Sequence, residues 1–140
     1  MTKNKYLSLF YILIITFAAS YIGSFVTTSF KEPWYSGIVL PSFSPPSWVF
    51  PPVWTTLYIM MSIAIWNIWI NFFDKKILKI YFINLFFNSI WSIIFFGFHL
   101  IGVALINLII ILLLLYFLNI KLALYSLKFM LLLFNYNILN

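Results

Sequence analysis

The chain has 140 residues, of which 65% are hydrophobic and only 7% are charged. Soluble domains carry about a quarter charged residues, so this composition excludes an ordinary soluble domain and indicates a protein embedded in a bilayer. The net charge of +6 comes from lysines that flank apolar segments, which is typical of a topology signal and not of a nucleic-acid-binding surface. We therefore expect a multi-pass integral membrane protein, in a bacterial inner or outer membrane, with no nucleic-acid partner.

The first predicted helix covers residues 6–28. Its apolar run resembles a secretory signal, but the run is about 20 residues long, which favours an uncleaved transmembrane helix. Ala19, Gly23 and Thr27 follow one another at four-residue spacing and share one face. Small residues on one face allow transmembrane helices to approach closely, so we expect this face to pack against another helix.

A loop of about 15 residues, 30–44, follows the first helix and is longer than a plain connection requires. It contains Trp34 and Tyr35. These rings suit the headgroup region of the bilayer, where aromatic side chains concentrate. They equally suit a lid over a cavity, and the loop sequence leaves both interpretations open.

The segment from Pro41 to Tyr58 holds five of the six prolines. Proline is tolerated in the first turn of a helix, where its missing N–H would have had no partner. The second helix is therefore predicted over 47–73, with Ser47 as its N-cap and a bent first turn caused by Pro52.

The second predicted helix carries an aromatic stripe. Phe50, Trp54, Tyr58, Met61 and Ile65 follow 4, 4, 3, 4 spacing and share one face. Such a stripe can wall a pocket for a flat apolar ligand. Packing combined with interfacial anchoring explains the same pattern, so the stripe alone does not establish a site.

The third predicted helix, 77–98, carries Asn84, Asn88, Trp91 and Phe95 within one narrow arc. Asparagine is costly against lipid, so both amides should face the bundle interior. They can act as interhelical hydrogen bonds, or they can orient the polar part of a mostly apolar ligand.

The carboxyl-terminal third is predicted as two helices, 103–118 and 122–139, separated by a weakly marked turn. Lys128 would fall near the middle of the fifth helix, which is unfavourable in a bilayer. A long fourth helix that ends near Lys128 and is followed by a partly inserted tail is the alternative. His99, in the turn before the fourth helix, is expected to be a solvated or capping residue.

Lysines before the first helix, between the second and third, and after the fourth predict a cytoplasmic amino terminus and an external long loop. The only acidic residues, Glu32 and Asp74, then lie on opposite sides of the membrane and cannot share a proton or a metal. The sequence therefore indicates no catalytic residue and no metal site.

Two sequence blocks resemble the tryptophan-rich sensory protein family, which includes the translocator protein or peripheral benzodiazepine receptor. The matching residues are Gly23, Trp34, Tyr35, Pro41, Pro45, Pro46, Trp48, Pro52, Trp54, Thr55 and Tyr58 in the first block and Asn88, Trp91, Ser92, Phe95, Gly97, His99 and Gly102 in the second.

The resemblance implies an all-α bundle of five transmembrane helices, usually dimeric, with a cavity that the long loop closes. Family members bind porphyrins and other tetrapyrroles, and some bind cholesterol or synthetic ligands. From the resemblance together with the aromatic stripe and the amide arc, the expected ligand-binding residues are Tyr35, Pro45, Phe50, Trp54, Tyr58, Asn84, Asn88, Trp91 and Tyr125.

Some positions depart from the family pattern. Val39 and Leu40 stand where lysines are common, and Asn84 stands where a glutamine is usual. The Pro-Tyr-x-x-Trp block of the family's fifth helix is absent, and only a weak alignment places Tyr125 at its tryptophan. Leu122, Tyr125 and Lys128 fit a loose sterol-contact pattern, a match that chance readily produces in a leucine-rich segment.

The resulting hypothesis is a membrane tetrapyrrole-binding protein that regulates or transports porphyrin-like ligands, with a role in stress response and no required cofactor. The expected partners are the bilayer, a tetrapyrrole or sterol-like small molecule and a second copy of the chain. The alternative is light- and oxygen-dependent porphyrin degradation, with tryptophans near the ring as redox participants.

Overall fold

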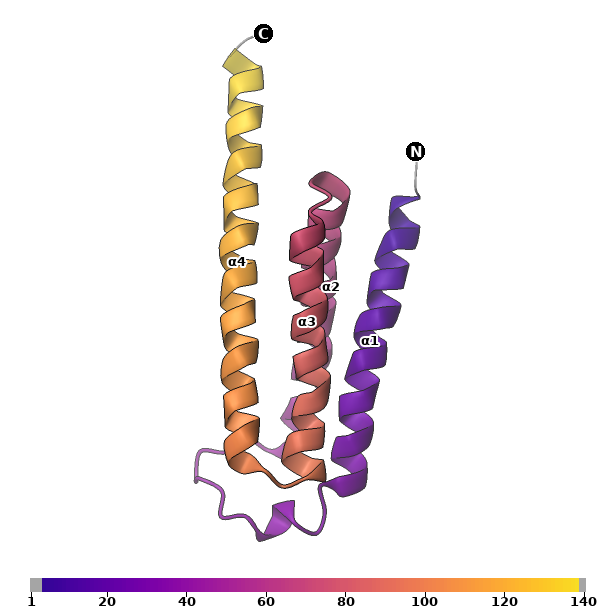
Figure 1. Ribbon diagram of the computed structural model, residues 1–140, viewed down its shortest axis with the longest axis vertical. Coiled ribbons are helices and arrows are strands. Elements are labelled where there is room, and N and C mark those ends of the chain that lie inside the picture. Colours follow the sequence, from indigo (N-terminus) through magenta and orange to yellow (C-terminus); the bar gives the residue numbers. More distant parts are fainter. Residues whose placement is uncertain (1–3, 139–140) are drawn as a thin grey trace.

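The computed structural model describes the backbone of residues 4–138, and the side chains up to residue 127 except those of 122, 125 and 126. Within this range the chain forms only helices and their connections. The four long helices lie side by side, with both described ends of the chain at one end of the bundle and the long loop at the other (Figure 1). They are α1 (Lys5–Phe30), α2 (Phe50–Asn71), α3 (Lys75–Ser92) and α4 (Ile101–Ile138).

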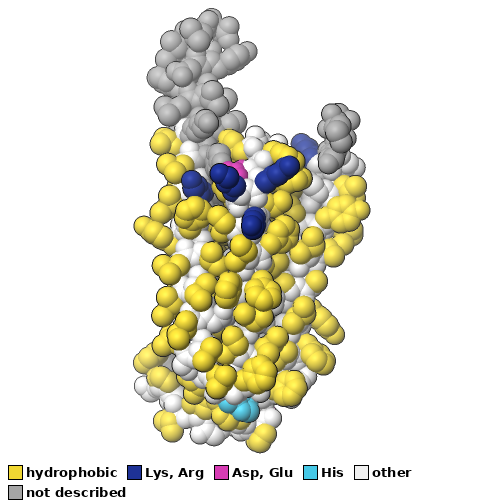
Figure 2. Space-filling view, viewed as in Figure 1, with side chains coloured by type: hydrophobic (Ala, Val, Ile, Leu, Met, Phe, Trp, Pro, Cys, Tyr) yellow, Lys and Arg dark blue, Asp and Glu magenta, His cyan; other side chains and the backbone are white. Residues whose placement is uncertain are grey.

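Among the described residues, four helical segments are long and apolar enough to cross a membrane. Their large apolar side chains are mostly exposed over the length of the bundle (Figure 2). Lipid tails, not water, are the favourable surroundings for such a surface. The prediction of a multi-pass, all-α membrane bundle is thus confirmed for four helices.

The start of α2 differs in detail from the prediction. A short 3₁₀ turn, η2 (Ser47–Val49), precedes the helix, and the two adjacent prolines lie in its first turn. The prolines are thus in the first turn, as expected, and the bend predicted there stays a prediction. Ser47 is not the N-cap: Val49 takes that position, and no side chain caps the helix. The amide of Val49, which a Ser47 cap would bind, already donates to the carbonyl of Pro46 at 3.0 Å.

The start of α3 is fixed by a side-chain cap. Asp74 Oδ1 accepts hydrogen bonds from the backbone amides of Lys76 at 2.8 Å and Ile77 at 3.3 Å. An aspartate at this position satisfies amides that the helix leaves unpaired and complements the helix dipole. The helix ends in a single π-helical turn, η3 (Ile93–Gly97).

The separate fifth helix predicted over 122–139 is not present in the described structure. Instead, α4 continues without a break through the expected turn at 119–121, where neither Gly nor Pro interrupts the sequence. Its 38 residues correspond to about 57 Å of helix, whereas a bilayer core is about 30 Å thick. Lys121 follows about 30 Å after Ile101, and α4 extends well past its neighbours beyond that level (Figure 1).

The helices pack in the order α2, α1, α3, α4, with the largest contacts between α3 and α4, α1 and α3, and α1 and α2. The small-residue face of α1 lies against α3, as predicted. Thr27 Oγ1 donates to Ser92 Oγ at 3.3 Å, and Ser89 Oγ donates to the carbonyl of Ala19 at 3.3 Å. A Cβ added to Gly23 would lie 3.3 Å from Ser92 Oγ, so this crossing depends on the missing side chain.

A buried polar contact joins α1 to α3 near the middle of the bundle. Thr16 Oγ1 and the Tyr81 hydroxyl are hydrogen-bonded at 2.5 Å, and both residues are at least 98% buried. Tyr81 belongs to a cluster of buried apolar side chains that also includes Ile12, Tyr58 and Ile65. Because lipid offers no alternative partner, this contact favours one alignment of the two helices.

The charged side chains are unevenly placed along the bundle. In Figure 2 lysines gather near the end that holds the amino terminus and the α2–α3 connection, and the histidine lies near the opposite end. This distribution agrees with the lysine pattern from which the sidedness of the protein was predicted. The sidedness itself stays a prediction.

We expect Gly23→Leu to destabilise the bundle by about 1–3 kcal/mol, because the new side chain must enter the space of Ser92. Gly102→Leu is the matched control, since no atom lies within 4 Å of a Cβ built there. Thermal unfolding in detergent measures both variants. Equal midpoints for the two would contradict close α1–α3 packing.

Candidate functional site

The long loop is attached to the end of α3 by stacked rings. Trp34 stacks on His99, with ring centroids 4.3 Å apart and planes 24° apart, and meets the edge of Phe95 at 5.4 Å. Tyr35, at the start of the short helix η1 (Tyr35–Gly37), contacts Phe96 at 5.7 Å. The loop therefore covers the η3 end of α3, an arrangement that agrees with the lid interpretation.

His99 is exposed, as predicted, but it also has a packing role that the sequence did not indicate. It occupies the left-handed region of the backbone, with φ of 58°, between η3 and α4. This conformation is uncommon for a residue other than glycine. The positive φ of His99 lies within the sharp turn between η3 and α4, where the imidazole stacks on Trp34.

Trp91 lies beneath the covered end. Its ring stacks on Phe95 at 5.0 Å and 9°, and it meets the edge of Phe96 at 6.0 Å. Its indole Nε1 is buried and has no hydrogen-bond acceptor among the described residues. A buried donor without a partner costs about 1–3 kcal/mol, so this N–H marks a place where a polar acceptor would be stabilising.

Two asparagine side chains of α3 form consecutive hydrogen bonds that lead to α4. Asn84 is fully buried and donates from Nδ2 to the carbonyl of Ile111 at 3.2 Å. Asn88 is half-buried and donates from Nδ2 to Asn84 Oδ1 at 3.1 Å. Asn84 is thus an interhelical hydrogen-bonding residue, while Asn88 Oδ1 makes no hydrogen bond with the described residues.

Asn107 is a buried polar residue that the site prediction did not include. It donates from Nδ2 to the carbonyl of Phe87 at 3.0 Å, and its Oδ1 is buried without a partner among the described residues. The signal in the sequence was its position as an isolated amide in an otherwise aliphatic helix. Together with Asn84, it fastens α4 to α3.

The aromatic stripe of α2 divides between two environments. Tyr58 is 7% exposed and packs toward α1, where its ring lies 6.4 Å from that of Phe17. Trp54 contacts Tyr58 at 5.9 Å, but both Trp54 and Phe50 are 43% exposed. Pro45 is exposed in the loop. The stripe is therefore partly core and partly surface.

Six of the nine predicted site residues thus form three pairs. Tyr35 and Trp91 share a contact with Phe96, Asn84 pairs with Asn88, and Trp54 pairs with Tyr58. Among the described residues, no hydrogen bond or ring contact links the α2 pair to the α3 groups. That all of them face one cavity stays a prediction. Tyr125 lies on α4, and its side chain is outside those described.

We expect Trp34→Ala to release the loop, because two aromatic contacts worth about 0.5–1.5 kcal/mol each are lost. Backbone amides of residues 35–38 should then exchange hydrogen about tenfold faster. Trp48→Ala is the control, since Trp48 lies in the same connection but is 74% exposed. Hydrogen–deuterium exchange of this segment is the measurement, and unchanged exchange in Trp34→Ala would argue against an attached lid.

Comparison with known proteins places these features in a family. A family model described as TspO/MBR family matches residues 11–138. Tryptophan-rich protein TspO of Archaeoglobus fulgidus is 38% identical over 87 residues, which cover 61% of this chain and 57% of that protein. The Tryptophan-rich sensory protein of Cereibacter sphaeroides is 36% identical over 87 residues, which cover 61% and 55%.

The Translocator protein of Homo sapiens is 36% identical over 99 residues, which cover 64% of this chain and 59% of that protein. The chain therefore spans less than two thirds of the length of these relatives. The family match, in contrast, runs through all four long helices and includes the loop and both amides of α3. On this evidence the chain belongs to the TspO/MBR family of membrane proteins.

Proposed function

We propose that this protein binds a tetrapyrrole in the membrane and regulates or transports porphyrin-like apolar ligands. The observation that supports this most directly is the buried indole N–H of Trp91, which has no acceptor among the described residues and lies among aromatic rings under the loop. A ligand with a flat apolar body and an acceptor group complements that environment. Porphyrins with propionate groups have this chemistry.

The surrounding residues supply the other interactions that such a ligand requires. Trp91 offers a ring face for stacking, and Trp54, already 43% exposed, offers a second one from α2. Asn88 Oδ1 and the hydroxyl of Tyr35 can form hydrogen bonds that orient the ligand. The loop attached through Trp34 would cover it. The names of two relatives, a sensory protein and a translocator protein, agree with a role in sensing or moving a ligand.

Titration with protoporphyrin tests the proposal through intrinsic tryptophan fluorescence. We expect saturable quenching, and we expect Trp91→Phe to weaken binding at least about tenfold, because a hydrogen bond to a charged acceptor is lost while the ring remains. Trp48→Phe, at an exposed position, should bind normally.

Two results would contradict the proposal. One is quenching that never saturates. The other is quenching that the combined variant Trp54→Ala with Asn88→Ala leaves unchanged, since those residues are proposed to contact the ligand from two helices.

A second candidate function is light- and oxygen-dependent porphyrin degradation. It is favoured by a continuous series of ring contacts from Trp91 through Phe95 to Trp34, with centroid distances of 5.0 and 5.4 Å. A redox-active indole would then lie beside the bound ring and a second one within the covering loop. In this second function the tryptophans would act as redox groups in addition to stacking on the ligand.

Illumination of the protein with protoporphyrin in air separates the two functions. Degradation by the protein predicts faster pigment loss than in protein-free detergent, and a slower rate in Trp91→Phe at saturating pigment. Equal rates with and without protein would exclude the degradation activity and leave the binding function intact.

A further inference from the structure

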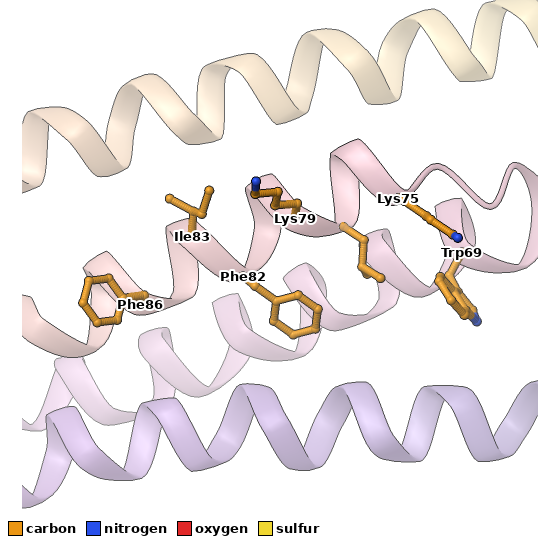
Figure 3. Close-up of a pocket in the computed structure, with 7 residues that line it drawn as sticks. Trp69, Lys75, Lys79, Phe82, Ile83 and Phe86 are labelled. Carbon is orange, nitrogen blue, oxygen red and sulfur yellow. The ribbon is translucent and has the colours of Figure 1, made fainter.

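An apolar groove with two lysines runs along α3 at the end of the bundle opposite the long loop (Figure 3). Its volume is about 620 Å³. Lys75 lies at one end, close to Trp69 from the last turns of α2, and Lys79 lies one turn farther along α3 (Figure 3). Phe82 and Phe86 line the groove farther along α3. The groove is therefore basic at one end and apolar along the rest of its length.

The sequence spacing accounts for this polarity. Lys75, Lys79, Phe82 and Phe86 are separated by 4, 3 and 4 residues, so they share one face of the helix. Eleven residues of helix correspond to about 16 Å. This is about half the thickness of a 30 Å hydrocarbon core, or the depth of one leaflet. A ligand with a charged head and a chain one leaflet deep matches the groove.

The positive charge of the two lysines is not balanced by a negative charge among the described residues that line the groove. None of the described residues that line it is acidic. Asp74 does not line the groove and accepts hydrogen bonds from the amides of α3. Lys75, the first residue of α3, is also unfavourable beside the positive end of the helix dipole, an effect that the carboxylate of Asp74 partly offsets. An anion held between Lys75 and Lys79 would offset both effects.

We propose that this groove binds one anionic phospholipid. In the proposed complex the exposed side chains of Lys75 and Lys79, whose ammonium groups point apart in Figure 3, turn toward one phosphate. Trp69 lies at the level of the headgroup, and an acyl chain packs on Phe82 and Phe86. Basic recesses between transmembrane helices recognise anionic headgroups in this way, and tryptophan favours the membrane interface. A second copy of the chain fits less well, because a symmetric interface would bring a second pair of lysines to the first.

Native mass spectrometry tests the proposal with the detergent-solubilised 140-residue chain and an equimolar mixture of phosphatidylglycerol and phosphatidylcholine. We expect one phosphatidylglycerol to be retained preferentially. Lys75→Gln with Lys79→Gln should weaken its retention on the order of tenfold, since each lysine near an anionic headgroup contributes severalfold. Lys75→Arg with Lys79→Arg should retain it.

Lys5→Gln with Lys76→Gln is the matched control, because it removes the same charge from two exposed lysines that do not line the groove. Equal retention of both lipids by the unmodified protein would overturn the proposal. Equal losses in the groove and control variants would do the same, since they would indicate a general charge effect.

Two further measurements exclude other occupants. Millimolar glycerol phosphate should not displace the lipid, and displacement would identify a site for free phosphate instead. The chain has no cysteine, so Phe82→Cys introduces a single thiol in the groove. We expect no intermolecular disulfide on oxidation in a bilayer, and efficient disulfide formation would show that a second copy covers the groove.

Discussion

The need to pair polar groups away from water determines how this bundle is assembled. Lipid offers no hydrogen-bond partners, so a polar side chain at membrane depth must be satisfied by a neighbouring helix or by its own. The third helix carries most of these groups. Tyr81 bonds to Thr16 of α1, Ser89 bonds to the backbone of α1, and Asn84 bonds to the backbone of α4. These bonds fix the two neighbours of α3 more specifically than aliphatic packing does.

This central helix also positions the candidate sites. Its loop-side end carries Trp91 and the two rings that hold the loop, and its opposite end carries the lysine groove. The two regions lie on one rigid element, separated by the hydrogen bonds to α1 and α4. A porphyrin-like ligand and an anionic lipid would therefore occupy different ends of the same helix.

The fold class was predictable from the sequence because long apolar runs and flanking lysines have few interpretations. The face formed by Ala19, Gly23 and Thr27 was predictable for a similar reason, since its four-residue period follows directly from helix geometry. The inward orientation of Asn84 followed from the cost of an amide in lipid, although its partner, the Ile111 carbonyl, has no sequence signature.

Other features depend on backbone geometry or on distant contacts. The 3₁₀ turn before α2 moves the N-cap from Ser47 to Val49. The Val49 amide, which a Ser47 cap would bind, already donates to the carbonyl of Pro46. A long fourth helix was considered only as an alternative, and that alternative ended near Lys128, whereas α4 continues to Ile138. The turn expected before residue 122 is weakly marked in the sequence, so the length typical of a membrane span favoured two helices. The stack of Trp34 on His99 joins residues 65 positions apart, which no local pattern reports.

The π-helical turn at the end of α3 has a consequence for the covering loop. Neighbouring residues of a regular α-helix point about 100° apart, yet Phe95 and Phe96 both reach the loop, where they meet the consecutive residues Trp34 and Tyr35. The loop is thus anchored at two adjacent points, which fixes its rotation as well as its position. A swing about either anchor alone is blocked by the other, so opening requires both pairs to separate together.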